Sequence, residues 1–273
     1  MEPAQLERAP FSDIDDMPAD IFDIVVTMLD AMSRHPEIRR VRHAAWEELR
    51  PARGQKLLDA GCGAGDVARA LAAAVGPSGA IVALDRSAAT LTAARERDGS
   101  AGIVRYETGD VGNLGFDDDS FDGVWCERVL QHVADADRSI AEFARVTRPG
   151  GRVCLLDTDW SSLAFDGVDG VLAGAVLRHA RGLLPERLDL GRTLRRRLID
   201  HGLRQVTATP VTCFFPDPSS AAVVLPMINP DVPRGTWPMP QGVREDWFAQ
   251  IDAAGERGDF LAVLTIWVAC GTV

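Results

Sequence analysis

The sequence predicts an α/β fold in which a doubly wound, mostly parallel sheet carries helices on both faces. Apolar strand patterns and amphipathic helix patterns alternate from residue 56 to residue 157, and such alternation is typical of parallel strands joined by helical crossovers. A glycine run, Gly61, Gly63 and Gly65, follows the first strand directly. Because glycine permits positive φ and close approach, this loop is expected to contact a ligand at the carboxyl edge of the sheet.

The N-terminal part of the chain is expected to be helical. Apolar residues recur there at helical spacing: Ile21, Ile24, Val25, Met28, Leu29 and Met32. This pattern predicts an amphipathic helix over residues 19–33, and a second helix is expected over residues 36–49. We interpret residues 1–50 as a helical lid.

Residues 51–160 carry the alternating pattern and are interpreted as the ligand-binding core. Strands are expected at 56–60, 80–84, 102–107, 121–126 and 151–157, and helices at 65–75, 87–97 and 136–147. The segments VGPSG and TRPGG separate neighbouring elements, since Gly and Pro mark turns and helix ends.

Beyond residue 160 the alternation gives way to a different pattern. Helices are expected at 168–183, 191–201 and 243–255, and strands at 204–213 and 260–270. Seven prolines between residues 214 and 240 predict an irregular covering segment rather than sheet. We interpret residues 1–273 as one domain, with cap insertions at 161–190 and 214–258 and with 191–213 and 259–273 completing the sheet.

Composition argues against several classes of partner. The chain has 40 Asp and Glu against 29 Lys and Arg, a net charge of -11, and phosphate backbones and anionic membranes repel such a protein. Two basic clusters, Arg34–Arg42 and Arg192–Arg197, lie in helical patterns and are expected to be solvated faces. We therefore expect a small-molecule substrate, no nucleic-acid or membrane partner, and a monomer or homodimer.

The cysteines and the N-terminal sequence indicate in which cellular compartment the protein is expected. Five cysteines without a close pair favour reduced thiols over disulfides or zinc, and no metal is expected. The acidic N-terminus lacks a basic start followed by an apolar core, and the chain has no run of 18 apolar residues. A cytoplasmic protein is expected.

Acidic residues accompany the ends of the first three strands. Asp85 ends the second strand, where a carboxylate can accept hydrogen bonds from both hydroxyls of a ribose, and Asp110 follows the third, where it can bind an exocyclic amine. A dinucleotide fingerprint requires a small residue at position 66, which is Asp66, and a phosphate-binding P-loop requires a G-K-[ST] sequence that is not present. The pattern therefore disfavours NAD, FAD and a P-loop nucleotide.

The segments LLDAGCGAG, VALD, TGD, SFDGVWCERVLQHV and RVTRPGGRVCLLD, in this order and spacing, resemble the class I S-adenosylmethionine-dependent methyltransferases. The likeness is strongest to the ubiquinone/menaquinone-biosynthesis type and covers residues 55–158. The resemblance implies a Rossmann-like, seven-stranded sheet whose last strand is antiparallel. It also implies S-adenosylmethionine as methyl donor, S-adenosylhomocysteine as product, and no metal.

The same resemblance assigns roles to the motif residues. The glycine loop would hold the methionine part of the cofactor, Asp85 the ribose hydroxyls, and Asp110 with Val111 the adenine edge. The expected cofactor-binding residues are Asp59, Gly61, Cys62, Gly63, Gly65, Asp85, Arg86, Gly109, Asp110, Val111 and Glu127.

Residues after the fourth strand lie next to the transferred methyl group in the resembling family. Glu127, Arg128 and His132 are therefore the candidates for catalysis, with His132 as general base because an imidazole titrates near neutral pH. A structural role for His132, and mutual pairing of Glu127 with Arg128, are the alternatives. The expected substrate pocket comprises Phe22, Gln131, Asp157, Trp160, Asn229 and Trp237, although core packing would also explain these residue types.

These features together predict methyl transfer to O, C or N of a small, apolar or aromatic metabolite. Transfer by in-line displacement needs mainly alignment and exclusion of water, with help from a general base for a weakly acidic acceptor. The alternative is a methyltransferase-fold protein that binds the cofactor but catalyses cyclisation or another non-methylating step in secondary metabolism. A cofactor-binding module without catalysis is a third hypothesis.

Overall fold

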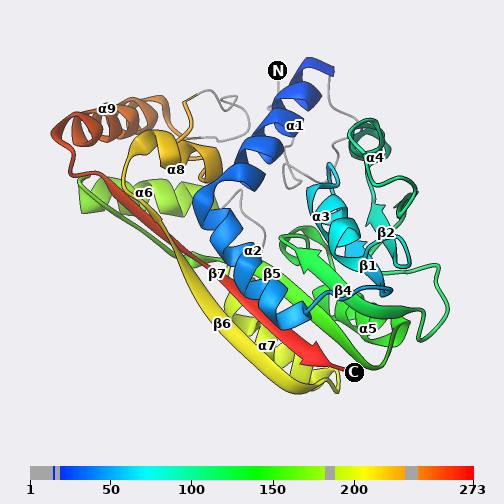
Figure 1. Cartoon of the computed structure of the whole chain (residues 1–273). Coiled ribbons are helices and arrows are strands. Elements are labelled where there is room, and N and C mark those ends of the chain that lie inside the picture. The colour runs from blue at the N-terminus through cyan, green and yellow to red at the C-terminus, as the bar shows by residue number, and fades with distance from the viewer. Residues whose placement is uncertain (1–14, 16–18, 182–187, 231–238) are drawn as a thin grey trace, which may run out of the picture.

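The computed structural model describes residue 15 and residues 19–181, 188–230 and 239–273, and Figure 1 shows its arrangement. A seven-stranded sheet has the order β3-β2-β1-β4-β5-β7-β6. Its strands are β1 Lys56–Ala60, β2 Ala80–Asp85, β3 Val104–Thr108, β4 Phe121–Glu127, β5 Thr147–Asp166, β6 Arg204–Phe215 and β7 Leu261–Thr272. Strand β7 is antiparallel to β5 and β6, and the other neighbours are parallel, which confirms the predicted fold class.

The helices follow the order that the sequence predicts. They are α1 Ala19–Arg34, α2 Pro36–Leu49, α3 Asp66–Val75, α4 Ala88–Glu96, α5 Ala136–Val146, α6 Gly170–Arg181, α7 Leu190–Asp200, α8 Pro218–Val224 and α9 Gln241–Arg257, with a short 3-10 turn, η2, at Leu130–His132. Of these, α8 was not expected. Among the described helices, none is both long and apolar enough to cross a membrane.

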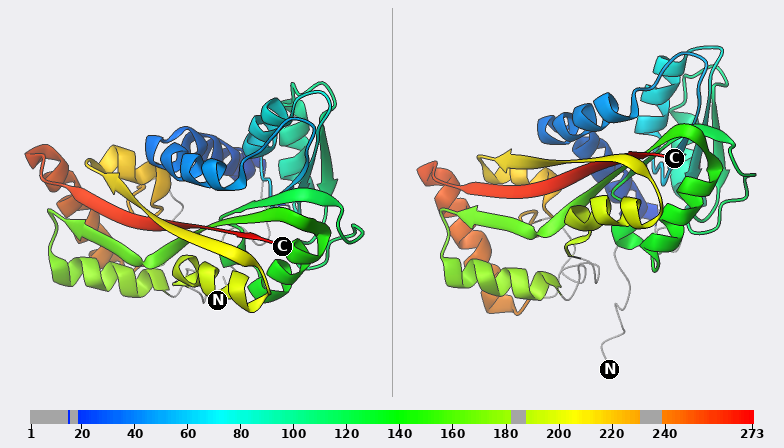
Figure 2. Two further views of the ribbon diagram at one scale, coloured as in Figure 1. Left: turned by 60° about the horizontal axis from the view of Figure 1, so that its bottom comes forward. Right: turned by 90° about the horizontal axis from the view of Figure 1, so that it is seen from below.

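Both faces of the sheet are covered, because successive residues of a strand point to opposite sides. Leu57 packs into the core beneath α2, α3 and α4, whereas its neighbour Leu58 packs into the second core beneath α5 and α7. The two views of Figure 2 show these helix layers on either side of the sheet. This burial on both faces explains why the parallel strands read as continuous apolar runs.

Local sequence signals place several helix starts at the carboxyl edge of the sheet. Ser87 caps α4 by accepting a hydrogen bond from the amide of Thr90 at 3.1 Å, and Asp135 caps α5 through the amide of Arg138 at 3.0 Å. These caps satisfy amides that the first helical turn leaves unpaired. The loops between strand tip and helix are thereby held in fixed positions around the ligand edge.

The late strands are longer than the sequence predicts. The predicted strand at 151–157 is instead β5, which runs to Asp166, and its Phe165 pairs with Ala262 of β7. The segment 161–166 thus continues the sheet rather than beginning a cap. Helices α6, α8 and α9 lie around this extension in Figure 1.

The expectation of irregular structure over 214–240 is wrong at its start. Strand β6 continues to Phe215, and α8 follows with Pro218 in its first turn and Asp217 accepting a hydrogen bond from the amide of Ser220 at 2.8 Å. Proline at the first helical position, preceded by an aspartate cap, favours a helix start. Proline therefore marks the start of a helix here and not only an interruption of regular structure.

Candidate functional site

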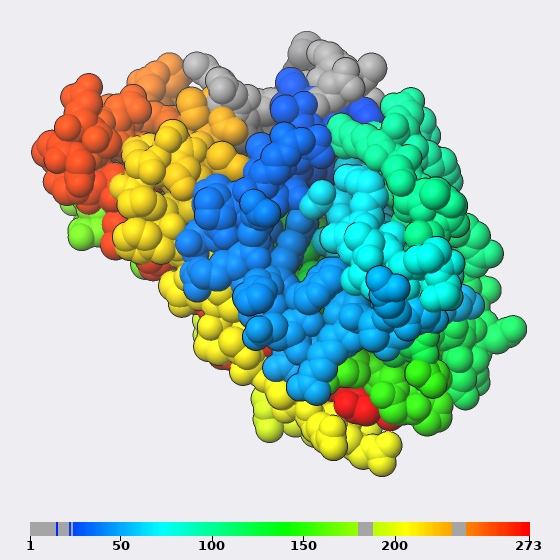
Figure 3. Space-filling view, viewed as in Figure 1, coloured from blue at the N-terminus to red at the C-terminus, as the bar shows by residue number. Residues whose placement is uncertain are grey.

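A cavity of about 690 Å³ opens beyond the carboxyl ends of β1, β2 and β4. Helix α1 contributes Met28, Leu29 and Met32 to its wall, and the opposite walls come from loops of the sheet and from α8. Figure 3 shows the α1 surface in blue between the surface of α8 and that of α3 and α4. Helix α1 therefore covers the edge at which ligands bind in doubly wound sheets.

The glycine loop forms one wall of this cavity. Gly61 has φ 81° and lies so close to the loop after β4 that a Cβ atom would stand 2.2 Å from Cγ2 of Val129. The amides of Gly61 and Cys62 donate to the carbonyl of Leu84 at 2.7 and 2.9 Å. Positive φ and close approach both require glycine here, as the sequence predicted.

Asp85 and Asp110 stand at the tips of neighbouring strands. The Asp85 carboxylate accepts hydrogen bonds from the amides of Gly63 at 2.8 Å and Ser87 at 3.0 Å, and Asp110 accepts one from the amide of Gly112 at 2.8 Å. Burial raises the pKa of Asp85, although these backbone hydrogen bonds oppose the rise. Both carboxylates line the cavity together with Arg86, Gly109 and Val111.

Asp59 is the most perturbed acid of the site. Its side chain is 2% exposed, and its Oδ2 atom has no hydrogen-bond partner among the described residues. Burial raises the pKa of Asp59 to about 8, with Glu127 and Asp85 adding to the rise and Arg42 opposing it. A buried carboxyl oxygen without a donor is costly, and a ligand ammonium group beside it would supply that donor.

Arg42 of α2 joins the site, which corrects the expectation of a solvated basic face over Arg34–Arg42. Its guanidinium donates to both oxygens of Glu127 at 2.8 and 3.1 Å and to Oδ2 of Asp66 at 2.7 Å. Burial lowers the pKa of Arg42, but the two carboxylates outweigh burial and leave the pKa raised. In Glu127, burial raises the pKa, and Arg42 and Arg128 reverse this effect, so Glu127 is ionised.

The second basic cluster, Arg192–Arg197, is largely exposed, as predicted, but Arg197 pairs with Asp137 of α5 and Arg192 pairs with a buried carboxylate. Arg192 donates to both oxygens of Asp159 at 2.6 and 2.8 Å, and the Asp159 side chain is only 3% exposed. The helical periodicity that placed these arginines outside was correct for the helix, but a facing carboxylate recruits one of them.

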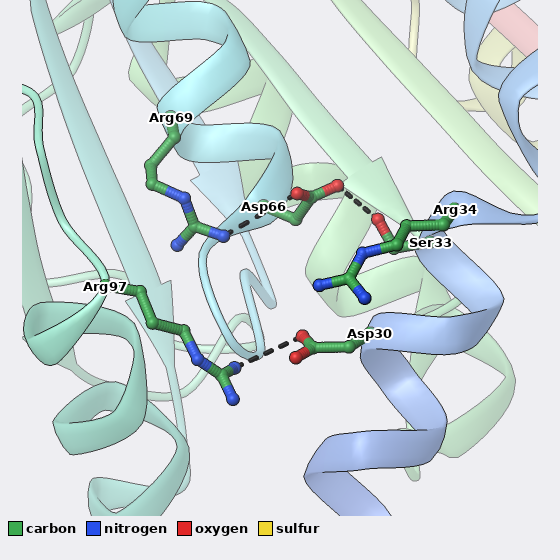
Figure 4. Close-up of a pocket in the computed structure, with 6 residues that line it drawn as sticks. All are labelled: Asp30, Ser33, Arg34, Asp66, Arg69 and Arg97. Atoms are coloured by element: carbon green, nitrogen blue, oxygen red, sulfur yellow. Dashed lines mark hydrogen bonds and ion pairs between the residues drawn. The ribbon is translucent and has the colours of Figure 1, made fainter.

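A polar cleft of about 260 Å³ lies beside the main cavity, between α1 on one side and α3 and the end of α4 on the other. In Figure 4, Asp30 faces Arg97 at 3.2 Å and Ser33 donates to Asp66. Arg69 lies 3.6 Å from the same Asp66. The contacts of Asp30 and Ser33 hold the covering helix α1 against α3 and the end of α4.

The loop after β4 carries the predicted catalytic residues. Arg128 pairs with Glu127 at 3.2 Å, as the pairing alternative proposed, and has φ 56°. His132 ends η2 and lines the cavity. Burial and the charge of Arg128 lower the pKa of His132 to about 4, so its imidazole is neutral at pH 7 but weakly basic. Its role as general base stays a prediction, without the near-neutral titration that motivated it.

The far end of the cavity is apolar. Trp160 forms part of its wall, and its indole Nε1 donates to Oε1 of Gln131 at 2.8 Å. The apolar lining residues at this end come from α1, β5, α8, β7 and the segments after η2 and α8: Met28, Leu29, Met32, Val133, Trp160, Val224, Pro226, Leu264 and Ile266. An uncharged, apolar ligand group suits these walls.

The remaining candidates divide by position. Gly65 has φ 76° and precedes α3, and Asp157 accepts hydrogen bonds from the amides of Thr158 at 2.8 Å and Gln131 at 3.1 Å. Gly65, Asp157, Phe22 and Asn229 are not among the described residues that line the cavity. Trp237 lies outside the described residues.

Sequence reasoning missed several lining residues. They include Ser33, Arg42, Asp66, Thr90, Val129, Thr158, Val224, Pro226, Leu264 and Ile266. The sequence did contain a signal for Arg42, because Val41 and Ala45 beside it are the apolar residues of a buried helix face. An arginine next to such a face is rarely buried unless it pairs with a carboxylate. No periodicity singles out Leu264 or Ile266, because every second residue of β7 is equally apolar.

Comparison with known proteins extends these observations. A family model described as a methyltransferase domain matches residues 58–155. An uncharacterized 37.1 kDa protein in transposon TN4556 of Streptomyces fradiae is 33% identical over 244 residues, covering 89% of this chain and 70% of that protein.

Two named methyltransferases match a shorter region. Methyltransferase GfsG of Streptomyces halstedii is 34% identical over 148 residues, covering 53% of this chain and 52% of that protein. Demethylmenaquinone methyltransferase of Staphylococcus aureus is 35% identical over 127 residues, covering 45% and 53%. The chain thus spans about half the length of these two relatives.

Solved structures share the fold. A putative methyltransferase from an antibiotic biosynthesis pathway of Anabaena variabilis superposes with TM-score 0.61 at 21% identity, over 89% of this chain and all of that chain (100%). The [4+2]-cyclase SpnF superposes with TM-score 0.55 at 20% identity, over 90% and 94%. At such identities these likenesses describe the arrangement of helices and strands alone.

Proposed function

The chain belongs to the class I S-adenosylmethionine-dependent methyltransferases, and we propose that it methylates an O, C or N atom of a small, apolar metabolite. The observation that carries the proposal is the convergence of Asp59, the glycine loop, Asp85 and Asp110 on one cavity. These residues lie far apart in sequence and meet only because the strand tips share one edge.

The residues present fit the cofactor. The unpartnered Oδ2 of Asp59 suits the ammonium group of its methionine part, and Gly61 and Gly63 leave room for close backbone contact. Asp85 suits the ribose hydroxyls, because a carboxylate accepts two hydrogen bonds at once. Asp110 and Val111 suit the adenine.

The bound cofactor supplies a methyl group activated by a positively charged sulfur. The chain's own contribution is alignment and shielding from water. Helix α1 covers the site, and the apolar walls around Trp160 and Leu264 receive the acceptor. His132 is proposed as a general base for substrates whose own proton is already acidic. Its neutral imidazole is too weakly basic to remove a proton from other substrates.

We also propose the setting in which the protein acts. A monomer or homodimer in the cytoplasm, acting without metal, nucleic acid or membrane, is supported by the net charge of -11 and by five free cysteines.

A non-methylating reaction in the same cavity is the second candidate. The fold is shared with the [4+2]-cyclase SpnF, so this architecture accommodates cyclisation as well as transfer. Product analysis separates the two candidates.

The test has two stages. Calorimetric titration with S-adenosylmethionine and S-adenosylhomocysteine should show one saturable site, which Asp85→Ala should weaken at least about tenfold through loss of a charge-assisted contact. Apolar phenols, enols and amines are then screened by mass spectrometry for replacement of a hydrogen by a methyl group. No binding of either compound would refute the proposal, whereas binding with a rearranged but unmethylated product would favour cyclisation.

A further inference from the structure

Charge is distributed unevenly along the cavity. The carboxylates at its cofactor end are Asp59, Asp66, Asp85, Asp110 and Glu127, and Asp30 of α1, which pairs with Arg97, also lines the cavity. Among the described lining residues, those that come from β5, α8 and β7 at the apolar end include no carboxylate. The arginines among these lining residues are Arg42, Arg86 and Arg128. An arginine that reaches the acceptor would favour an acceptor with a negative charge, so the position of each arginine matters.

The three arginines occupy different places. Arg42 is held by Glu127 and Asp66, and Arg86 follows Asp85 at the tip of β2. Arg128 lies between the two ends, since it pairs with Glu127 at 3.2 Å and also contacts the sulfur of Met32 in the apolar wall. Glu127 is shared with Arg42, so one carboxylate faces two guanidinium groups.

The backbone of Arg128 is held in an unfavourable conformation. Its φ of 56° lies in the left-handed region, which costs a residue other than glycine about 1 kcal/mol. The Arg128 amide donates to the carbonyl of Leu156 at 2.7 Å, and its carbonyl accepts a hydrogen bond from Nε2 of Gln131 at 3.4 Å. Such strain concentrates at functional sites, where it aims a side chain.

The apolar end has little to offer as a base. The pKa of His132 is about 4. Burial raises the pKa of Asp157 to about 7, but its carboxylate accepts from the amides of Thr158 and Gln131 and is not among the described groups that line the cavity. Glu127 is committed to Arg42 and Arg128. An acceptor bound here must release its proton largely by its own acidity, and a nearby cation increases that acidity.

We propose that the acceptor is an apolar molecule bearing an acidic hydroxyl, a phenol or enol, and that Arg128 binds its oxygen as an anion. The inference rests on the proposed methyl transfer. The hydroxyl proton leaves to solvent, directly or by way of the weakly basic imidazole of His132. The acceptor then bonds the methyl carbon through its oxygen or, in an enolate, its carbon. The electron pair of the broken carbon–sulfur bond stays on sulfur. Arg128 would thus select acceptors by acidity as well as by shape.

The experiment uses 7-hydroxycoumarin, an apolar phenol whose neutral and anionic forms absorb at different wavelengths. It is titrated with pH in the presence of wild-type protein saturated with S-adenosylhomocysteine. The pKa of the bound probe should fall by about one unit or more, as expected for an acid within about 4–6 Å of a cation. The groups facing Arg128 that also carry or acquire charge are Glu127, Arg42, Asp157 and His132.

Variants separate Arg128 from general electrostatics. Arg128→Gln should abolish the shift, and Arg128→Lys should retain part of it, since the charge remains but the planar guanidinium is lost. Arg39→Gln, which removes an exposed cation of α2 that is not among the described lining residues, should leave the shift in place. A shift that survives in Arg128→Gln, or is lost equally in Arg39→Gln, would overturn the assignment.

A wild-type measurement covers the case in which Arg128→Gln fails to fold. At pH 7, 7-methoxycoumarin, which cannot ionise, should bind about tenfold more weakly than 7-hydroxycoumarin, the difference expected for one charge-assisted hydrogen bond. Equal affinities with S-adenosylhomocysteine bound would refute the inference and leave methyl transfer standing. Failure to bind S-adenosylhomocysteine would refute the proposed function, and this inference with it.

Discussion

The two ends of the cavity are built in different ways. The end that we propose for the cofactor includes the loops that directly follow β1, β2, β3 and β4, and glycines such as Gly61 and Gly63 line it. The apolar end, which we propose receives the acceptor and therefore call the acceptor end, consists of side chains from α1, α8 and the lengthened strands β5 and β7, such as Trp160 and Leu264. The first end depends on conformation, whereas the second depends on which side chains meet.

This difference predicts how each end tolerates change. Backbone geometry at the cofactor end leaves few acceptable residues, so a single methyl group should be disruptive. Apolar walls at the acceptor end can exchange one side chain for another of similar size at modest cost. Substitutions at the two ends should therefore differ in size of effect and in which ligand they affect.

The largest effect is expected for Gly61→Ala. Its new methyl group would lie 2.2 Å from Val129, and φ is 81°, so the loop must move away from the cofactor. Affinity for S-adenosylhomocysteine should fall at least about 100-fold, measured by calorimetry. Gly150→Ala is the matched control, because its φ is also 81° but no heavy atom lies within 4 Å of the new Cβ. Equal binding by both variants would contradict the close-approach argument.

Asp59→Asn should have the next largest effect and should separate binding from stability. Loss of the carboxylate should weaken S-adenosylhomocysteine binding about tenfold or more. In the absence of ligand, the buried carboxyl has its pKa raised from 3.8 to about 8. Between these values the folded chain keeps a proton that the unfolded chain releases, so the free energy of unfolding falls as pH rises.

The Asn variant lacks this titration. Compared with wild type, it should therefore gain stability as pH rises from 5 to 8.5, by about 4 kcal/mol in urea denaturation. An unchanged difference in stability across this interval would show that Asp59 is ionised in the folded protein throughout.

Trp160→Phe tests the acceptor end with a smaller effect. It removes the hydrogen bond to Gln131 but keeps an aromatic wall, so binding of 7-hydroxycoumarin should weaken about tenfold while S-adenosylhomocysteine binding stays unchanged. Trp267→Phe is the control, because its indole contacts Asp159 at 3.4 Å and it is not among the described lining residues. Weaker binding of S-adenosylhomocysteine by Trp160→Phe would contradict the separate roles assigned to the two ends of the cavity.

The smallest effect is expected where α1 is tied across the site. Asp30→Asn breaks the 3.2 Å ion pair with Arg97, in which the Asp30 side chain is 24% and the Arg97 side chain 35% exposed. Partly exposed ion pairs contribute less than about 1 kcal/mol to stability. Dissociation of S-adenosylhomocysteine should quicken about threefold in stopped-flow measurements. Asp259→Asn, which breaks the exposed pair with Arg257, should leave the rate unchanged. A rate unaffected by Asp30→Asn would mean that this pair does not restrain α1.

Prediction from sequence succeeded where the backbone conformation allows only one residue type, such as glycine at a positive φ. The strand at residues 56–60, the glycine loop and the helix starting near residue 66 appear as expected. Sequence reasoning failed on β5, which it ended at 157 and which runs to Asp166. The missing information was the partner strand β7, because strand length depends on pairing rather than on local propensity.

Site residues divide in the same way. Asp85 and Asp110 follow strands at fixed offsets, so their meeting at one edge could be predicted. Arg42 looked like a surface residue, because its carboxylate partner Glu127 stands 85 positions away. His132 was placed correctly beside the cavity, but its lowered pKa comes from burial and from Arg128, and neither is visible in the chain order.

The sequence by itself determined the sheet, the glycine loop and the carboxylates at the strand tips, because parallel strands bring their ends to one edge whatever the rest of the chain does. Tertiary structure alone decided the acceptor end. There, α1, α8 and the extended β5 and β7 bring together Met32, Trp160, Val224 and Leu264, and apolar contacts lack the directional or spacing rule that would identify them in advance.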